Sequence, residues 1–370
     1  GAPAGDSGGR LGDSVAVPEW NASNALELLA YAGPRLAAVE LAEELAPPPG
    51  SPSYERLVAA YRELRTHTTL PILGPCVGMA AAFDDPRCEN DADCAPSAFL
   101  EAFLAEEGLV DGVCVHAYDN DAGANWSALP APASQATRQL AAIIANANLT
   151  SSVPVWCGEC GPHNEGGVPN VTDRVASSLW FVDFLGRAAR LGVREVGRQA
   201  LLGSHYGLLE SAETSYAAPN PDFWVAVLWT RVMGPIVLDV RADGATDRLR
   251  VYAHCDDDAS IGLAFANLDD AAVDLDLDDT VLGGGAADLW LLTTSDIYSK
   301  DLLLNGVLID RDAPTLAPLP PRCLDDLVDS ARLRVPPLAF GFLRVLGRSP
   351  TCARASTTLE AHPPTAVGGV

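Results

Sequence analysis

Basic residues are scarce in this chain, and long apolar runs are missing. The 370 residues include 24 Lys and Arg against 49 Asp and Glu, which gives a formal net charge of −25 at pH 7. Such a surface repels phosphate backbones and sulfated polysaccharides, so the composition argues against nucleic acid as a partner. Because no apolar run reaches about 18 residues, the sequence predicts no membrane-spanning helix.

The sequence predicts neither a metal site nor any other cofactor. Cys157 and Cys160 have the spacing of one half of a zinc site, which is the rival interpretation of this pair. No second cysteine or histidine pair stands at zinc spacing, so this interpretation is disfavoured.

Nine cysteines and four Asn-x-Ser/Thr sequons indicate the compartment. Cysteine at this number, together with the sequons, favours a secretory route. We therefore expect a protein that is either secreted, for example into the extracellular matrix, or located in the endolysosomal lumen. In both locations it is expected to be free or associated with a membrane. Since nine is odd, at least one thiol is free or pairs outside the chain. The sequons begin at Asn21, Asn125, Asn148 and Asn170.

Two cysteines enclose an acidic loop. Cys88 and Cys94 flank residues 89–93, which carry three carboxylates. A bond between these cysteines would close the loop locally, and we expect it.

Strands and helices alternate through the first two thirds of the chain. Residues 1–17 are rich in Gly, Asp and Ser and are expected to be flexible. The alternation that follows argues for a parallel α/β fold, in which five strands are three short of an eight-stranded barrel. Strands are expected at 36–43, 70–73, 112–115, 153–157 and 195–202, and helices from 21 onward and at 53–66, 96–107, 133–146 and 172–191.

The pattern changes after about residue 236. Short β-rich runs at 249–252, 261–265 and 289–292 are separated by turns. This is typical of an antiparallel β-sandwich, expected over 236–352. The tail, residues 353–370, is expected to be disordered.

Glu159 directly follows the apolar strand at 153–157. In a barrel of alternating strands and helices, catalytic groups lie at that end of the strands. A second carboxylate, Glu44, follows the first expected strand. Two carboxylates on one face are the minimum equipment of a glycosidase, although any acidic chain carries carboxylates at strand ends.

Several stretches together resemble the heparanase-like glycoside hydrolases, a family of endo- and exo-β-glucuronidases. The resemblance covers roughly residues 18–352 and implies that 18–235 form about strands four to eight of a (β/α)8 barrel that lacks its first strands. A separate N-terminal chain, as in some relatives, would complete such a barrel. The matching stretches are 20–24, 73–78, 115–118, 156–159, 198–199, 203–206 and 249–255.

The resemblance assigns the two catalytic carboxylates. Glu159 matches the nucleophile that closes strand seven, and Glu44 matches the acid/base that closes strand four. The family motif Asn-Glu-Pro reads Glu43-Glu44-Leu45 here, which places like charge beside the acid. Glu40 and Glu43 are alternative acids, and Glu44 as a solvated surface charge is the alternative to any catalytic role. A catalytically impaired protein that binds glycans or proteins is the rival function.

The resemblance also implies substrate-binding residues. His116 and Tyr118 resemble the His-x-Tyr of strand six, whose side chains line the sugar site, although such a pair alone usually reflects packing. Tyr206 matches a tyrosine that binds the glucuronate carboxylate or the nucleophile region. Arg198 lies on strand eight, where it pairs with a catalytic carboxylate or forms a buried structural ion pair.

A glycine loop and a disulfide complete the resemblance. Gly166 and Gly167 match a run whose backbone N–H groups receive the substrate carboxylate, while Glu165 replaces a glycine there. Cys255 and Cys352 match positions that the family joins. Because residues 80–85 are apolar and acidic where heparan-cleaving relatives are basic, we expect a glucuronic-acid-containing substrate without sulfate.

Overall fold

The computed structural model describes residues 17–78, 82, 97–119, 135–146, 153–210, 217–240, 248–256, 259–277, 286–312, 318–324, 332–347, 349 and 351–352. The expectations for residues 1–16, Cys88, Cys94, Asn125, Asn148 and the tail 353–370 lie outside these ranges. In the described part of the chain, no helix has the length and apolarity needed to cross a bilayer.

The chain divides into two compact units. The first comprises the described residues of Gly1–Tyr118, Gln135–Cys160 and Leu191–Arg198. The second comprises those of Asp119–Ser134, Gly161–Arg190 and Gln199–Val370. The domain limits expected from the sequence, at 17/18, 235/236 and 352/353, stay predictions.

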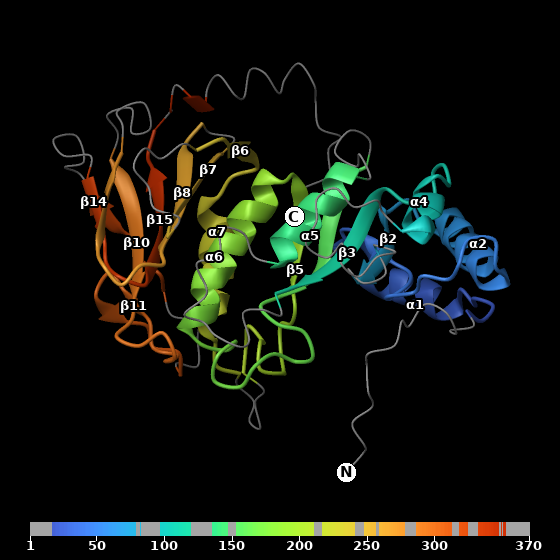
Figure 1. Ribbon diagram of the computed structural model, residues 1–370, viewed down its shortest axis with the longest axis horizontal. Coiled ribbons are helices and arrows are strands. Elements are labelled where there is room, and N and C mark those ends of the chain that lie inside the picture. Colours follow the sequence, from blue (N-terminus) through green and yellow to red (C-terminus); the bar gives the residue numbers. More distant parts are fainter. Residues whose placement is uncertain are drawn as a thin grey trace, which may run out of the picture. The chain divides into compact units, whose positions relative to one another are not determined.

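A five-stranded sheet in the order β1-β2-β3-β4-β5 organises the first unit (Figure 1). The pairs β1–β2, β2–β3 and β4–β5 are parallel, which confirms the parallel α/β arrangement predicted from the alternation. The central strands are rich in buried apolar residues, as strands covered on both faces must be. The strands are β1 (Val39–Glu40), β2 (Ile72–Gly78), β3 (Gly112–Tyr118), β4 (Val155–Gly161) and β5 (Val193–Arg198).

Helices connect these strands and begin at clear sequence signals. Ser51 caps α2 by accepting a hydrogen bond from the Tyr54 N–H, and Pro52 occupies the first turn, where its missing N–H costs nothing. Ser97 caps α4 in the same way through the Leu100 N–H. The helices are α1 (Ser23–Ala32), α2 (Pro52–His67), α4 (Ala98–Leu104) and α5 (Gln135–Asn146), with a 3-10 turn η1 (Gly33–Arg35) after α1.

The second unit is built on an antiparallel sheet with the strand order β12-β11-β10-β15-β8-β7-β6. A further strand pairs with β10, and a separate two-stranded sheet is formed by β14 and β9. The strands are β6 (Ile236–Leu238), β7 (Leu249–Cys255), β8 (Ile261–Asn267), β9 (Val273–Asp276), β10 (Ala287–Thr293), β11 (Leu303–Leu304), β12 (Val307–Leu308), β13 (Arg322–Leu324), β14 (Arg332–Val335) and β15 (Ala339–Val345).

Two helices, α6 (Val175–Arg190) and α7 (Pro221–Val232), pack on strands of that sheet (Figure 1). Almost every residue of α6 is buried, including the polar side chains of Ser177, Ser178 and Asp183. Helix α6 appears where the sequence predicted a helix at 172–191, whereas α7 was not predicted. Strands β7, β8 and β10 appear where the short β-rich runs predicted them.

A buried carboxylate fixes α6 to β7. Asp183 accepts a hydrogen bond from the Tyr252 hydroxyl at 2.5 Å and forms ion pairs with Arg187 Nε at 2.9 Å and Arg250 Nε at 3.0 Å. The side chains of Asp183 and Arg250 are only 10% and 8% exposed, so water screens this cluster little. Burial, and then the charge of Asp183, raises the pKa of Tyr252, so its hydroxyl stays protonated and donates.

We predict that Asp183→Asn destabilises the protein by about 3–5 kcal/mol, because the buried guanidinium of Arg250 and the half-buried one of Arg187 lose their shared counter-charge. Urea unfolding followed by circular dichroism measures this. The matched control is Asp239→Asn, whose ion pair with Arg190 is 64% and 49% exposed and should contribute little. Equal losses from both substitutions would contradict the assignment.

A disulfide joins Cys255, at the end of β7, to Cys352 across 97 residues of chain. This is the pair that the family resemblance implied. Both cysteines are buried within the apolar core of the second unit, against residues such as Ile261 and Val345.

We predict that this disulfide contributes roughly 4–5 kcal/mol by restricting the unfolded chain. The double variant Cys255→Ser/Cys352→Ser should unfold at a correspondingly lower urea concentration than the wild type. Peptide mapping without reduction should show the linked pair. Alkylation of both thiols in native, non-reduced protein would show that the bond does not form.

Candidate active site

Glu159 lies on β4, and its carboxylate contacts two residues of the neighbouring strand β3. The Tyr118 hydroxyl donates to Glu159 Oε2 at 2.7 Å, and His116 Nδ1 lies 3.8 Å from the same oxygen. His116 and Tyr118 are two residues apart on a strand, so their side chains leave the sheet on the same side. The spacing His-x-Tyr therefore brings both to one carboxylate.

Glu44 reaches the same imidazole from the segment after β1. Its Oε1 lies 3.1 Å from His116 Nδ1, and its N–H donates to the Cys76 carbonyl at 2.9 Å. Gly78 lies opposite His116 in the β2–β3 register and leaves room for the contact, since a Cβ there would lie 3.0 Å from Glu44 Oε1. The structure thus brings together four residues that the sequence analysis selected: Glu44, His116, Tyr118 and Glu159.

These contacts limit the separation of the two carboxylates. The Glu44 and Glu159 oxygens lie 3.1 and 3.8 Å from the same nitrogen of His116, so they are at most about 7 Å apart. This limit includes the roughly 5–5.5 Å between the carboxyl groups of a retaining glycosidase. It reaches only the lower edge of the ~6.5–9.5 Å found in an inverting glycosidase. Beside them is a cleft of about 300 Å³. It is lined by Glu40, Leu41, Ala42, Glu43, Cys76, His116 and Glu159.

His116 and Glu44 behave electrostatically as an ion pair. Burial disfavours the imidazolium, but the hydrogen bond to Glu44 and the charges of Glu159, Glu44 and Glu40 outweigh it and raise the pKa of His116. The hydrogen bond from His116 lowers the pKa of Glu44 against the effect of burial. A carboxyl that gives up its proton readily is unusual for the acid of a glycosidase, where the pKa is normally raised.

Glu40 has the opposite tendency. Partial burial raises its pKa, opposed by His116 and reinforced by the charges of Glu159 and Glu43. The structure therefore keeps Glu40 as an alternative acid beside Glu44.

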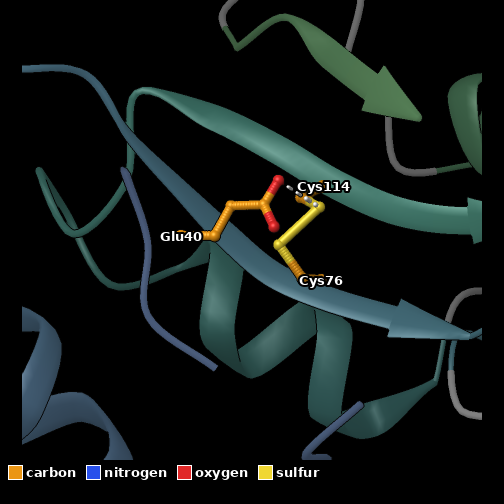
Figure 2. A group of neighbouring side chains, drawn as sticks. All are labelled: Glu40, Cys76 and Cys114. Carbon is orange, nitrogen blue, oxygen red and sulfur yellow. Dashed lines mark hydrogen bonds between the residues drawn. A yellow bond between two sulfur atoms is a disulfide. The ribbon is translucent and has the colours of Figure 1, made fainter. Parts of the chain in front are cut away.

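A disulfide that the sequence analysis missed lies next to Glu40. Cys76 on β2 is bonded to Cys114 on β3, and the carboxylate of Glu40 points toward the two sulfur atoms (Figure 2). A partial signal was present: Cys114 lies inside the expected strand at 112–115, Cys76 lies three residues beyond the one at 70–73, and consecutive strands of a parallel α/β sheet are often neighbours. Cys157 and Cys160 are also joined, which commits both sulfurs of the suspected half zinc site to a bond.

The other predicted site residues have different surroundings. Arg198 ends β5 and pairs in register with Cys160 on β4. Gly166, Gly167 and Tyr206 belong to the second unit, where the Gly166 carbonyl accepts from the His205 N–H and Tyr206 packs against Gly167.

The loop that contains these two glycines has a backbone conformation that few residues adopt. Glu165, Gly166 and Gly167 all have positive φ, at 51°, 86° and 84°, which favours glycine at each position. The Gly167 N–H donates to the Asn164 carbonyl at 3.0 Å. That N–H is therefore already engaged within the loop that was expected to receive a substrate carboxylate.

Comparison with known proteins shows that a segment of the chain resembles the heparanase-like glycoside hydrolases. Heparanase-like protein 1 of Arabidopsis thaliana is 45% identical over 100 residues, which are 27% of this chain and 18% of that protein. Baicalin-beta-D-glucuronidase of Scutellaria baicalensis is 32% identical over 196 residues, or 52% of this chain and 36% of the relative. Chicken heparanase is 30% identical over 201 residues, 51% of this chain and 37% of that protein. No family model matches the chain.

Solved structures agree on the fold. A family 51 α-L-arabinofuranosidase from Bifidobacterium longum superposes with a TM-score of 0.54 at 15% identity, covering 80% of this chain and 62% of the other. A family 51 arabinofuranosidase from Thermotoga petrophila gives 0.52 at 11% identity, with 79% and 62% covered. At such identities the likeness concerns the fold alone.

We predict that the pKa of the His116 imidazole lies above its ordinary value of about 6.5, and that Glu44→Gln lowers the titration midpoint. The reason is that the neutral amide no longer stabilises the imidazolium. Histidine side-chain NMR measures both titrations. His254, whose pKa is lowered by burial, is the internal control and should not move. An unchanged His116 midpoint in the variant would show that the pair does not form in solution.

Proposed function

We propose that this chain carries the catalytic centre of a retaining glycoside hydrolase that cleaves β-glucuronide bonds in glycans or small glucuronides. The observation that carries the proposal is the buried His116, whose one ring nitrogen lies within 4 Å of both Glu44 and Glu159. The resemblance to proteins named heparanase and baicalin-beta-D-glucuronidase supports the substrate class. An acidic cleft supports a substrate without sulfate.

In the proposed mechanism, Glu159 attacks the anomeric carbon while the bond to the leaving oxygen breaks. The Tyr118 hydroxyl holds one Glu159 oxygen at 2.7 Å, which orients the attacking carboxylate. The leaving oxygen takes a proton from Glu44, whose proton is shared with His116. Water then attacks the glycosyl–Glu159 ester and returns a proton to Glu44, which regenerates both carboxyl groups.

The proposal also includes a complete barrel and a β-sandwich. The five parallel strands would be part of a (β/α)8 barrel whose remaining strands a further segment or an N-terminal partner chain supplies, and the antiparallel strands would form its β-sandwich. We propose an extracellular or endolysosomal location, with glycans on the exposed Asn21 and Asn170. Gly166, Gly167, Tyr206 and Arg198 are proposed to contact the sugar or steer the carboxylates.

A second candidate function rests on one specific observation. Glu44, in the altered motif Glu43-Glu44-Leu45, has a lowered pKa and is therefore ionised when an acid would have to carry a proton. A protein with such a site would bind a glycan without cleaving it efficiently.

We predict that Glu159→Gln lowers kcat on an aryl β-glucuronide by about a thousandfold or more, because the amide cannot form the glycosyl ester. The fold should persist, as checked by the thermal melt. Glu63→Gln, on the surface of α2, is the control and should keep full activity. A Glu159→Gln variant close to the wild-type rate would rule out this nucleophile.

The acid is identified by leaving-group dependence. Removing the acid should slow a substrate with a poor, alkoxide-like leaving group by roughly 10²–10⁴-fold and spare one with an activated phenol. We expect this pattern for Glu44→Gln. The same pattern for Glu40→Gln instead would transfer the role to Glu40. Tight glycan binding without turnover by the wild type would favour the second candidate function.

A further inference from the structure

We propose that Cys76, Cys114 and Glu40 form a thiol-gated zinc site. The site is closed while the two cysteines form their disulfide, and it binds one Zn²⁺ when a dithiol reductant has opened that bond. This proposal does not depend on the hydrolase function.

The three groups already have the arrangement of a metal site. They come from the consecutive strands β1, β2 and β3, and one ligand atom from each lies within 4.8 Å of the others (Figure 2). Two thiolates and a carboxylate are a donor set that suits Zn²⁺. Three protein ligands leave a fourth position for water, and both Glu40 and Cys76 line the open cleft.

One distance can be compared directly with zinc geometry. Glu40 Oε1 lies 3.5 Å from Cys114 Sγ. A sulfur at about 2.3 Å and an oxygen at about 2.0 Å from one tetrahedral zinc are separated by roughly 3.5 Å. This oxygen therefore already lies at the distance from Cys114 Sγ that a shared zinc requires, while the Cys76 and Cys114 sulfurs must separate to about 3.8 Å.

The neighbouring strand leaves space for this cluster. Gly158 on β4 faces it, and a Cβ at that position would lie 2.5 Å from Cys114 Sγ and 3.1 Å from Glu40 Oε1. Any other residue at 158 would push into the ligand atoms. The glycine thus keeps open the volume that the proposed site occupies.

Charge and burial favour a cation in the reduced state. Glu40 shares the cleft with the carboxylates of Glu43 and Glu159, and a divalent cation would relieve their mutual repulsion. Cys76 and Cys114 are 1% and 0% exposed, so two thiolates there are stable only with a counter-charge.

The gating reaction balances with a dithiol as the reductant. The Cys76–Cys114 bond breaks, the two cysteine sulfurs gain two electrons and two protons, and the reductant becomes a disulfide. Zinc binding then releases both thiol protons to solvent. Cys76 lies at a bulge where the β2–β3 register shifts between Pro75 and Val77, so its sulfur can move without breaking ladder pairs.

The test uses the full chain, reduced and freed of reductant without oxygen. The reduced chain should retain one Zn²⁺ after gel filtration, and the oxidised chain none. With Co²⁺ in place of Zn²⁺, the reduced chain should show a thiolate-to-cobalt charge-transfer band. A reduced chain without bound zinc, or an oxidised chain that binds equally well, would overturn the proposal.

Variants assign the ligands. Cys76→Ser and Cys114→Ser should each lose the cobalt band, and Glu40→Gln should weaken zinc binding by at least about tenfold. The double variant Cys157→Ser/Cys160→Ser is the control and should keep the full signal. Loss in that control alone, with retention in Cys76→Ser, would place the metal elsewhere and refute the site.

A measurement on the unchanged sequence covers variants that fail to fold. In the reduced wild type, Zn²⁺ should protect Cys76 and Cys114 from alkylation, while the exposed Cys323 reacts with and without zinc. Equal alkylation of Cys76 and Cys114 in both conditions would contradict the proposal.

Discussion

The candidate active site depends on one buried imidazole between two carboxylates. His116 lies on β3 and its side chain is only 3% exposed, so water screens the charges beside its ring little. Glu159 comes from β4 on one side and Glu44 from the segment after β1 on the other. Glu159 is positioned by a strand of the parallel sheet and Glu44 by the segment that follows another strand. Because both lie close to the same nitrogen of His116, that residue limits the distance between the two carboxylates.

The same imidazole sets the charge state of the site. The cleft collects the carboxylates of Glu40, Glu43 and Glu159 within a chain that is already strongly acidic. Because His116 partners Glu44, it keeps that carboxyl ionised, while Glu40 responds to the same surroundings by holding its proton more strongly. Two carboxyl groups four residues apart therefore have pKa values shifted in opposite directions. The assignment of Glu44 as the acid rests on its match to the family motif and not on its pKa, since a glycosidase acid normally has a raised pKa.

Much of this architecture follows from the sequence. The period of apolar residues places the five strands and most helices, because buried parallel strands and amphipathic helices have distinct patterns. That His116 and Tyr118 point to one side of β3 also follows, since alternate residues of a strand share a face. Their place beside Glu159 was implied by the family resemblance. The contacts between strands do not follow in this way, because they depend on the strand register, which no local pattern encodes. Examples are the bond between Cys76 and Cys114 and the reach of Glu44 past Gly78. Helix α7 was missed because its apolar residues surround it on more than one face.

Trapping the covalent intermediate shows directly whether Glu159 attacks the sugar. A 2-deoxy-2-fluoro-β-glucuronosyl fluoride forms the glycosyl ester but slows its hydrolysis, so the adduct can be located by mass spectrometry of peptides. The account predicts one added sugar per chain, on the peptide that contains Glu159. An adduct on Glu40, Glu43 or Glu44 instead, or no adduct from a preparation that hydrolyses aryl glucuronides, would contradict it.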